Sequence, residues 1–253
     1  DEGRTSEGAA RRRLHERQAP RVRRFLGLAD VAWLGVAVGA LVAIWWRLAT
    51  TAPTTGFFFE AVDLFYQYVP DYHYIAERLR AGELPLWNPW QGLGQPFLAM
   101  LYPGALYPAR LLLLALDVPT ALCVSLLAHL LLGLGATYVL CRTLGASPAG
   151  AVVGATVFTR AHAWPNIYWP GYLEACAWLP VAALALVRFA ASGRWRWACG
   201  LGLATGLPVL AGCHQHALFA AYGLAVVGAA LACDPARRGI LCTRRGMIGL
   251  AAA

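Results

Sequence analysis

The residues that could do chemistry gather in one stretch, 57–108, where acids are interspersed with aromatic residues, prolines and glycines. Asp63 and Gln67 lie four residues apart and Pro70 follows, in the pattern D-x-x-x-Q-x-x-P. On a helix this spacing places a carboxylate and an amide on one face, where both can meet the same hydroxyl group. A carboxylate that aromatic neighbours partly desolvate can serve as a general base. We therefore predict that Asp63 is a catalytic base and that Gln67 binds the substrate.

A helix is predicted from Pro70 to Arg80, because proline suits a first helical turn, basic residues suit the last turn and Gly82 can end it. Apolar side chains recur along it at helical spacing, which predicts an amphipathic helix lying on a membrane surface. The recurring residues are Tyr68, Tyr72, Ile75 and Leu79. Asp71 falls in the first turn, where an acid complements the helix dipole. Two interpretations of Asp71 stay open, helix stabilisation and substrate binding.

The segment 84–97 combines aromatic side chains with residues that favour turns. Asn88 can close an Asx turn, and the prolines and glycines around it favour a rigid, bent loop. Trp87 and Trp90 could stack on the face of a sugar, although tryptophan at a membrane interface more often serves as an anchor. Trp87 and Asn88 are our candidate substrate-binding residues in this segment.

Later turns add further candidates. Glu174 stands at the mouth of an apolar run, where an acid is costly to bury unless it is paired, so we expect it to bind substrate. His214 and Gln215 lie in a turn between two apolar runs and are expected to do the same. His216 follows closely, but no third ligand clusters with the two histidines, so the sequence predicts no metal site.

Two arginines could bind an anion. Arg110 and Arg160 are expected on the side of the membrane opposite to most other arginines. Each could hold a lipid phosphate through its bidentate guanidinium group, and ordinary headgroup contact is the alternative for both.

Motifs for nucleotide binding and for the common hydrolases are missing. The sequence contains no Walker loop, no G-x-G-x-x-G after a strand, no H-E-x-x-H and no G-x-S-x-G. We therefore expect no cofactor, and the sequence gives no support for a divalent metal. An outward-facing enzyme of this kind would need an activated substrate that a lipid delivers.

The composition predicts a membrane protein. Of 253 residues, 59% are hydrophobic and only 13% are charged, whereas about 25% of residues are charged in a soluble domain. The formal net charge is +8, but its arginines fall between apolar runs, where orientation in a bilayer explains them better than nucleic-acid binding. We predict an all-α, polytopic helical bundle with a large first outer loop that contains interfacial helices.

The chain divides into a basic cytoplasmic tail, 1–24, and a transmembrane domain, 25–253, whose first outer loop is 49–119. Predicted spans lie near 25–48, 120–141, 149–163, 172–189, 198–212 and 217–233, and a seventh begins at 247. Asp30 lies near the cytoplasmic end of the first span and is expected to reach the interface by snorkelling. Because the sequence does not begin with Met and its last apolar run stops at Ala253, we interpret it as an N-terminal fragment.

One stretch, 96–116, is apolar enough to be mistaken for a span. If it crossed the bilayer, most later arginines would face outward, which the positive-inside rule disfavours. We therefore expect interfacial or re-entrant helices there, broken by Pro103 and Pro108. The N-terminus is then cytoplasmic, and the large loop and the turns at His162 and His214 lie outside a bacterial cytoplasmic membrane.

These motifs resemble the first outer loop of bacterial YfhO-like membrane proteins, a group similar to the GT-C glycosyltransferases. The matching residues are Asp63-x-x-x-Gln67-x-x-Pro70, Leu79-x-x-Gly82-x-x-Pro85-Leu86-Trp87-Asn88-Pro89, Gly92-x-Gly94-x-Pro96, Tyr107-Pro108, Trp178-Leu179-Pro180 and Ala211-Gly212-x-His214-Gln215. The family has His-Pro-Gln at the last of these turns, whereas here His214 is followed directly by Gln215.

The resemblance implies transfer of a sugar from a polyprenyl-phosphate donor to a glycan, polymer or protein acceptor outside the membrane. Asp63 occupies the position of the loop acid that serves as base in GT-C enzymes. Gln67 and Asp71 would orient the acceptor, and an outer arginine would neutralise the leaving phosphate. Membrane lipids are the other expected partner, and nucleic acid is not.

Two other functions stay open. A transporter or flippase of lipid-linked saccharides would need ionisable residues buried within the membrane, and the sequence shows few. A scaffold for envelope assembly would leave the acids of the loop dispensable.

Overall fold

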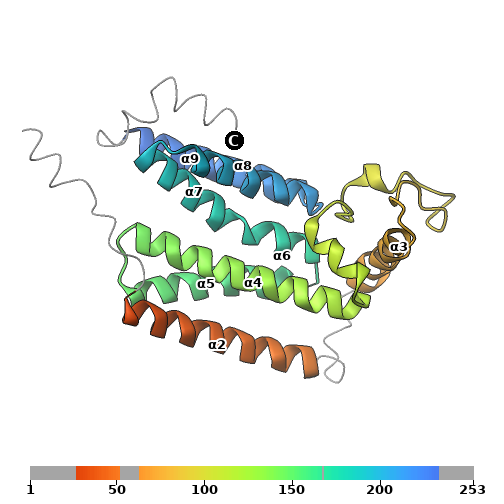
Figure 1. The fold of residues 1–253 in the computed structure, drawn as a ribbon, viewed down its shortest axis with the longest axis horizontal. Helices are drawn as coiled ribbons and strands as arrows, with labels where there is room; N and C mark the ends of the chain where they lie inside the picture. Colours follow the sequence, from red (N-terminus) through yellow and green to blue (C-terminus); the bar gives the residue numbers. More distant parts are fainter. Residues whose placement is uncertain (1–26, 52–62, 167, 234–253) are drawn as a thin grey trace, which may run out of the picture.

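The structure, a computed structural model, describes three ranges of the chain (Figure 1): residues 27–51, 63–166 and 168–233. Within these ranges every regular element is a helix, and the one β-bridge, between Asn88 and Gln95, is isolated. The prediction of an all-α fold is therefore confirmed. The expected tail at 1–24 and the expected apolar segment from 247 lie outside the described residues.

The long helices follow one another through short connections. They are α2 (Leu28–Thr51), α4 (Val118–Thr143), α5 (Pro148–Asn166), α6 (Pro170–Ala177), α7 (Leu179–Ser192), α8 (Trp195–Leu210) and α9 (His214–Cys233). Four described helical stretches are long and apolar enough to cross a membrane: Leu28–Trp46, Val118–Thr143, Pro170–Ser192 and His214–Cys233. These coincide with four of the six predicted spans. α5 and α8 coincide with the other two, but they do not meet the same measure of length and apolar character.

The helices run up and down beside one another, with α4 in the middle (Figure 1). α4 packs against α5, α6 and α7, while α2 contacts α4 and α5, and α8 and α9 pack against α7. Small residues allow close approach between helices. A Cβ atom at Gly133 of α4 would lie 3.7 Å from the Cα atom of Ala177 in α6. Such small-residue contacts are typical of helices that pack in lipid.

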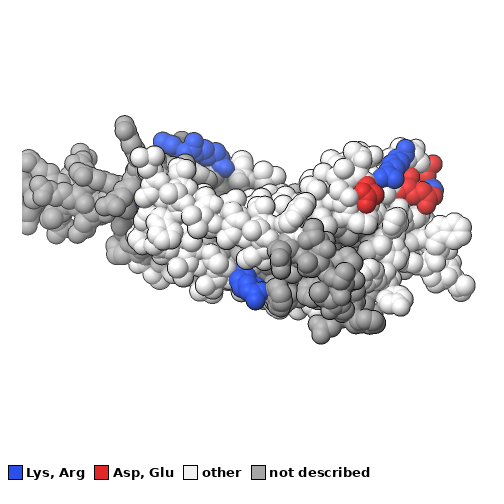
Figure 2. Space-filling view, turned by 90° about the horizontal axis from the view of Figure 1, so that it is seen from below, with Lys and Arg blue, Asp and Glu red and all other residues white. Residues whose placement is uncertain are grey.

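Charged side chains are spread unevenly over the molecule. Figure 2 shows basic side chains towards one end of this face and midway along it, and acidic side chains together with basic ones at the other end, near α3 (Val69–Arg80). The first end includes Arg142 in the last turn of α4 and Arg194 before α8. The second end includes Glu77 in α3 and Asp117 before α4.

Asp30 is buried and paired, which corrects the expectation that it snorkels. Its carboxylate accepts hydrogen bonds from Arg142 Nε at 2.6 Å and from the Tyr138 hydroxyl at 2.5 Å. Both donors belong to the last turns of α4, which lie beside the start of α2. Since they satisfy the carboxylate inside the protein, it does not need to reach water.

Residues 63–117, called the loop region below, form a small layer of their own at one end of the bundle (Figure 1). A π-helical turn, Leu64–Tyr68, leads into α3, Val69–Arg80. The helix predicted from Pro70 to Arg80 is therefore confirmed, and Gly82 follows it with a φ of +73°.

The apolar face of α3 packs against protein, so this face does not meet a membrane surface as the sequence suggested. Its buried residues belong to a hydrophobic cluster with the short helix η5 (Pro108–Leu114) and the start of α4. The cluster consists of Tyr68, Tyr72, Tyr74, Ile75, Ala76, Phe97, Leu113, Val118, Ala121 and Leu122. Hydrophobic periodicity shows that a helix has an apolar face, but it does not identify the apolar surface that the face meets.

The stretch 96–116 contains only short 3₁₀ helices, η4 (Leu98–Met100) and η5 (Pro108–Leu114). No helix long enough to cross a membrane lies there, as predicted. Pro103 lies between the two helices and Pro108 begins the second, so proline limits the length of regular structure here.

Three glycines join the loop region to the bundle where backbone segments touch. Gly212, between α8 and α9, has a φ of +89° and packs on the backbone of Tyr102. A Cβ atom at Gly104 would lie 2.8 Å from the carbonyl oxygen of Ala211, and one at Gly171 would lie 2.7 Å from the same oxygen. A side chain at any of the three positions would separate the loop region, α6 and the turn between α8 and α9.

We predict that Gly212→Ala destabilises the protein by about 2 kcal/mol or more, because alanine would adopt a left-handed conformation and collide with the Tyr102 carbonyl group. The measurement is the midpoint of thermal unfolding of the purified protein in detergent. Gly206→Ala in α8 is the matched control, since nothing lies within 4 Å of its Cβ position. Equal midpoints for the two variants would contradict the packing described.

Candidate functional site

The loop region and α6 form a pocket of about 270 Å³ around Asp63. Its lining residues are Asp63, Gln67, Tyr68, Trp169 and Tyr172. The structure thus brings the predicted acid and the predicted amide into one pocket and adds aromatic walls to it. The Asp63 side chain is exposed, so the partial desolvation that the sequence suggested for it is not observed. Burial raises the pKa of Tyr68 to about 12.

Trp169 holds the Asp63 carboxylate in place. Its indole Nε1 donates a hydrogen bond to Asp63 Oδ2 at 2.6 Å. No other described side chain donates to Asp63, so its second carboxylate oxygen and Gln67 can both meet a ligand hydroxyl group in this pocket. We did not identify Trp169 or Tyr172 from the sequence, because they lie more than a hundred residues after Asp63. The available signal was their place in a turn expected on the same side as the loop.

Asp71 is enclosed within the loop region. Its Oδ1 accepts a hydrogen bond from Gln91 Nε2 at 2.7 Å, and its Oδ2 accepts one from the Tyr102 hydroxyl at 2.6 Å. Burial raises the pKa of Asp71, and the two hydrogen bonds partly oppose this rise. With the side chain fully buried, this geometry favours a structural role for Asp71 over direct contact with a substrate. The Tyr102 ring in turn lies 6.5 Å, between centroids, from the ring of Tyr68, so Asp71 is linked to the Asp63 pocket.

The segment 84–97 forms the expected bent loop. Asn88 is buried, and its side-chain oxygen accepts a hydrogen bond from the Trp90 backbone N–H at 2.9 Å, which confirms the predicted Asx turn. The Trp87 ring lies over Gly94, where a Cβ atom would come within 2.8 Å of it. Trp87 is thus packed on its own loop, whereas Trp90 is 81% exposed. Neither Trp87 nor Asn88 lines the Asp63 pocket.

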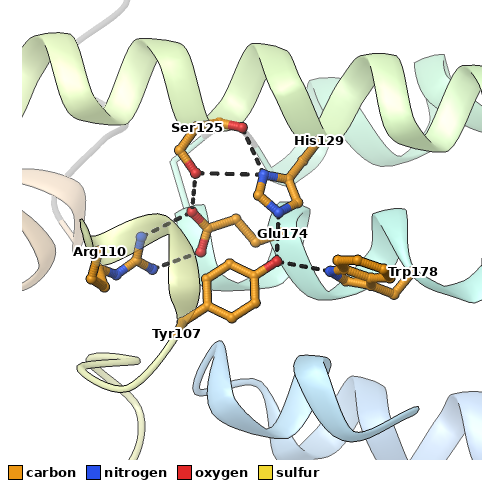
Figure 3. A network of polar contacts seen from close by, with 6 residues as sticks. All are labelled: Tyr107, Arg110, Ser125, His129, Glu174 and Trp178. Carbon is orange, nitrogen blue, oxygen red and sulfur yellow. Dashed lines mark hydrogen bonds and ion pairs between the residues drawn. The ribbon is translucent and has the colours of Figure 1, made fainter. Parts of the chain in front are cut away.

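A buried ion pair connects the loop region with α6 (Figure 3). The Arg110 guanidinium donates to both carboxylate oxygens of Glu174, at 2.9 and 2.6 Å. Arg110 is 3% exposed and Glu174 is fully buried. The guanidinium carbon also lies 4.1 Å from the ring centroid of Tyr72, so its face is covered as well.

Hydrogen bonds extend this pair into α4 and towards α7 (Figure 3). Ser125 donates to Glu174 Oε1 at 2.6 Å, and the Ser125 carbonyl oxygen lies 2.7 Å from His129 Nδ1. His129 Nε2 lies 2.5 Å from the Tyr107 hydroxyl, which also accepts a hydrogen bond from the Trp178 indole at 2.8 Å. The network therefore ties η5, α4 and the junction of α6 with α7 together.

This network pairs Arg110 with Glu174, where the sequence suggested a ligand for each of them. The bidentate guanidinium fork predicted for a lipid phosphate binds a carboxylate of the chain itself. Glu174, predicted to contact a substrate, is used in the same pair. The condition noted from the sequence, that such an acid must be paired if buried, is met here within the protein.

The remaining predicted residues lie around the site. Gln215 is in the first turn of α9 and accepts a hydrogen bond from Tyr172, a wall of the Asp63 pocket, at 3.0 Å. His214 begins α9 and is exposed. The helix thus starts earlier than the expected span at 217, because Gly212 already makes the turn. Arg160 is exposed on α5, and the side chain of His162 lies outside the described residues.

A scan of protein families, a search of curated proteins and a search of solved structures find no match to this chain. The class of this protein is therefore described from its fold and its pocket alone. The described part of the protein is an all-α bundle with four helices suited to cross a membrane and a polar, aromatic-walled pocket at one end.

We predict that Glu174→Leu destabilises the protein by about 3–5 kcal/mol, because it leaves the Arg110 charge buried and unpaired. The double variant Arg110→Met, Glu174→Leu should recover most of this loss, since two apolar side chains then fill the space. Unfolding free energies of both single variants and of the double variant would be compared.

The exposed pair of Arg78 with Glu83 is the control for this comparison. Glu83→Gln should change stability by less than about 1 kcal/mol, as for other solvent-exposed pairs. Additive effects at Arg110 and Glu174 would contradict the coupling inferred from the geometry.

Proposed function

We propose that this protein is a membrane glycosyltransferase that moves a sugar from a polyprenyl-phosphate donor to an acceptor hydroxyl group. The observation that carries the proposal is the pocket in which Asp63 and Gln67 lie between aromatic walls. An exposed carboxylate with one oxygen fixed by Trp169 is suited to take a proton from a bound hydroxyl group. The resemblance of the loop motifs to YfhO-like proteins and GT-C glycosyltransferases supports the same reaction.

In the proposed reaction, the acceptor oxygen attacks the anomeric carbon of the sugar. The bond from that carbon to the phosphate oxygen breaks, the lipid phosphate leaves, and the acceptor proton passes to Asp63. Inversion at the anomeric carbon follows from a single displacement. Gln67 would orient the acceptor hydroxyl group, and Tyr68 and Tyr172 would cover apolar faces of the sugar. Arg160 is the remaining candidate to bind the leaving phosphate, since Arg110 is paired with Glu174.

The proposed location is the bacterial cytoplasmic membrane, with the loop region outside. Two observations support it: the helices suited to cross a membrane, and the position of Arg142 in the last turn of α4 and of Arg194 before α8, at the end of the bundle opposite to the loop region. Arginine-rich ends normally face the cytoplasm. A lipid-linked donor would then reach the Asp63 pocket from the bilayer, and a glycan, polymer or protein acceptor would reach it from outside.

A second candidate function is transport of a lipid-linked saccharide. The observation that favours it is the buried network of Arg110, Glu174 and His129, because ionisable groups among helices that could span a membrane are typical of transporters. A transporter would move the saccharide across the membrane without forming a new glycosidic bond.

Asp63→Asn is expected to lower sugar transfer about a hundredfold or more, because asparagine cannot accept the proton. The measurement is transfer from a radiolabelled polyprenyl-phosphate sugar to acceptor in proteoliposomes that contain the purified protein. Glu83→Gln, an exposed acid of the same loop region, is the matched control and should retain the wild-type rate. Wild-type turnover by a folded Asp63→Asn variant would exclude Asp63 as the base, and saccharide movement without transfer would favour the transporter.

Position 83 should face outward and position 194 inward if the proposed orientation holds. Single cysteines at Glu83 and Arg194 in a cysteine-free background would be treated, in intact cells, with a thiol reagent that does not cross membranes. We expect labelling of the Glu83→Cys variant alone, and of both variants after the cells are opened. Labelling of the Arg194→Cys variant in intact cells would contradict the proposed orientation.

A further inference from the structure

A second and larger cleft, of about 690 Å³, lies on the outer face of α3. It is formed by residues of α3, by the loop after Asn88 and by the start of α4. The α3 residues recur at helical spacing, so that one face of the helix makes the floor. This cleft shares no lining residue with the Asp63 pocket.

Trp90 presents a flat apolar surface at this cleft. Its side chain is 81% exposed, although an indole is normally covered. The Asx turn holds the Trp90 backbone through its hydrogen bond to the Asn88 side chain. Pro89 lies between the two residues, and its ring restricts the φ angle there. The indole is therefore carried on a rigid turn. Such a surface suits a ligand that stacks a flat apolar face on it.

The other groups of the cleft are suited to hydroxyl groups. The His73 imidazole can form hydrogen bonds with a ligand, and the Glu77 carboxylate can accept further hydrogen bonds. The charged groups already have partners within the protein: Glu77 pairs with Arg78, Asp117 caps α4 at the Thr120 N–H, and the Arg80 guanidinium donates to two backbone carbonyl groups. This arrangement favours an uncharged ligand rich in hydroxyl groups over a cationic or anionic one.

We propose that this cleft binds a neutral saccharide, with the sugar stacked on Trp90, and that it holds the acceptor glycan of the proposed transferase. That the bound saccharide is the acceptor rests on the proposed function, whereas saccharide binding by the cleft does not. A continuous set of contacts runs between the two pockets. Gln91 of the cleft donates to Asp71, Tyr102 also donates to Asp71, and the Tyr102 ring lies 6.5 Å, between centroids, from the ring of Tyr68 in the Asp63 pocket. A chain bound in the cleft would thus lie against the same rigid layer as the catalytic pocket.

The test is binding of cellotetraose, maltotetraose and chitotetraose to the wild-type protein in lipid nanodiscs, measured by calorimetry and by saturation-transfer NMR. Nanodiscs are needed because maltoside detergents present the same chemistry as the probe. We expect at least one tetrasaccharide to bind, and Trp90→Ala to weaken its affinity about tenfold. Trp90→Phe should retain part of the affinity. Leu93→Ala, an exposed apolar residue of the same loop that does not line the cleft, should retain all of it.

Three outcomes would overturn the proposal: no tetrasaccharide binds, Trp90→Ala binds as well as wild type, or tetralysine binds in place of the saccharides. The Asp63→Asn variant separates this proposal from the proposed function. If the Asp63→Asn variant binds saccharide normally and the wild-type protein transfers no sugar, saccharide binding by the cleft is supported and the transferase proposal is rejected. If the wild type transfers sugar but binds none of the probes, the transferase stands and the cleft proposal falls.

Discussion

The position of the loop region on the helix bundle depends on one buried ion pair. Arg110 and Glu174 come from elements 64 residues apart, and neither charge would be stable in this interior without the other. Ser125 and Tyr72 complete the surroundings of the pair from α4 and α3. Because α6 begins immediately after Trp169, the helix that carries Glu174 also carries the indole that holds Asp63. The pair therefore positions the wall of the pocket without touching a ligand.

Burial separates the acids of this end of the protein into two kinds. Asp71 and Glu174 are enclosed, and both oxygens of each accept hydrogen bonds from neighbouring side chains. Asp63 is exposed and has one described side-chain donor, Trp169. An acid with unused hydrogen-bonding capacity in a pocket can bind a new ligand, whereas an enclosed acid maintains the structure around it. This difference supports Asp63, among the predicted acids, as the group that meets substrate.

The sequence predicted the features that depend on local chemistry. The start and end of α3, the Asx turn at Asn88 and the short helices in 96–116 follow from proline, glycine and capping residues within a few positions. It did not predict which partner each polar group finds. Asp30 with Arg142 and Arg110 with Glu174 are pairs between distant segments, and single-sequence patterns contain no information about such distances.

The same limit explains the error about α3. Its apolar stripe is real, but a stripe has the same appearance whether lipid or protein covers it. Of the five residues that line the Asp63 pocket, the sequence predicted that two, Asp63 and Gln67, act together. Trp169 and Tyr172 come from a distant turn whose proximity only the folded chain reveals.

The convergence of Gly104, Gly171 and Gly212 on two carbonyl groups has an evolutionary consequence. A side chain at any of these positions would collide with a backbone carbonyl group, so glycine cannot be replaced there as long as this packing is retained. Homologues too divergent to align elsewhere would then still share this triplet, one glycine from each of three distant segments. The triplet offers a spatial signature by which remote members of such a lineage can be distinguished from unrelated helical bundles.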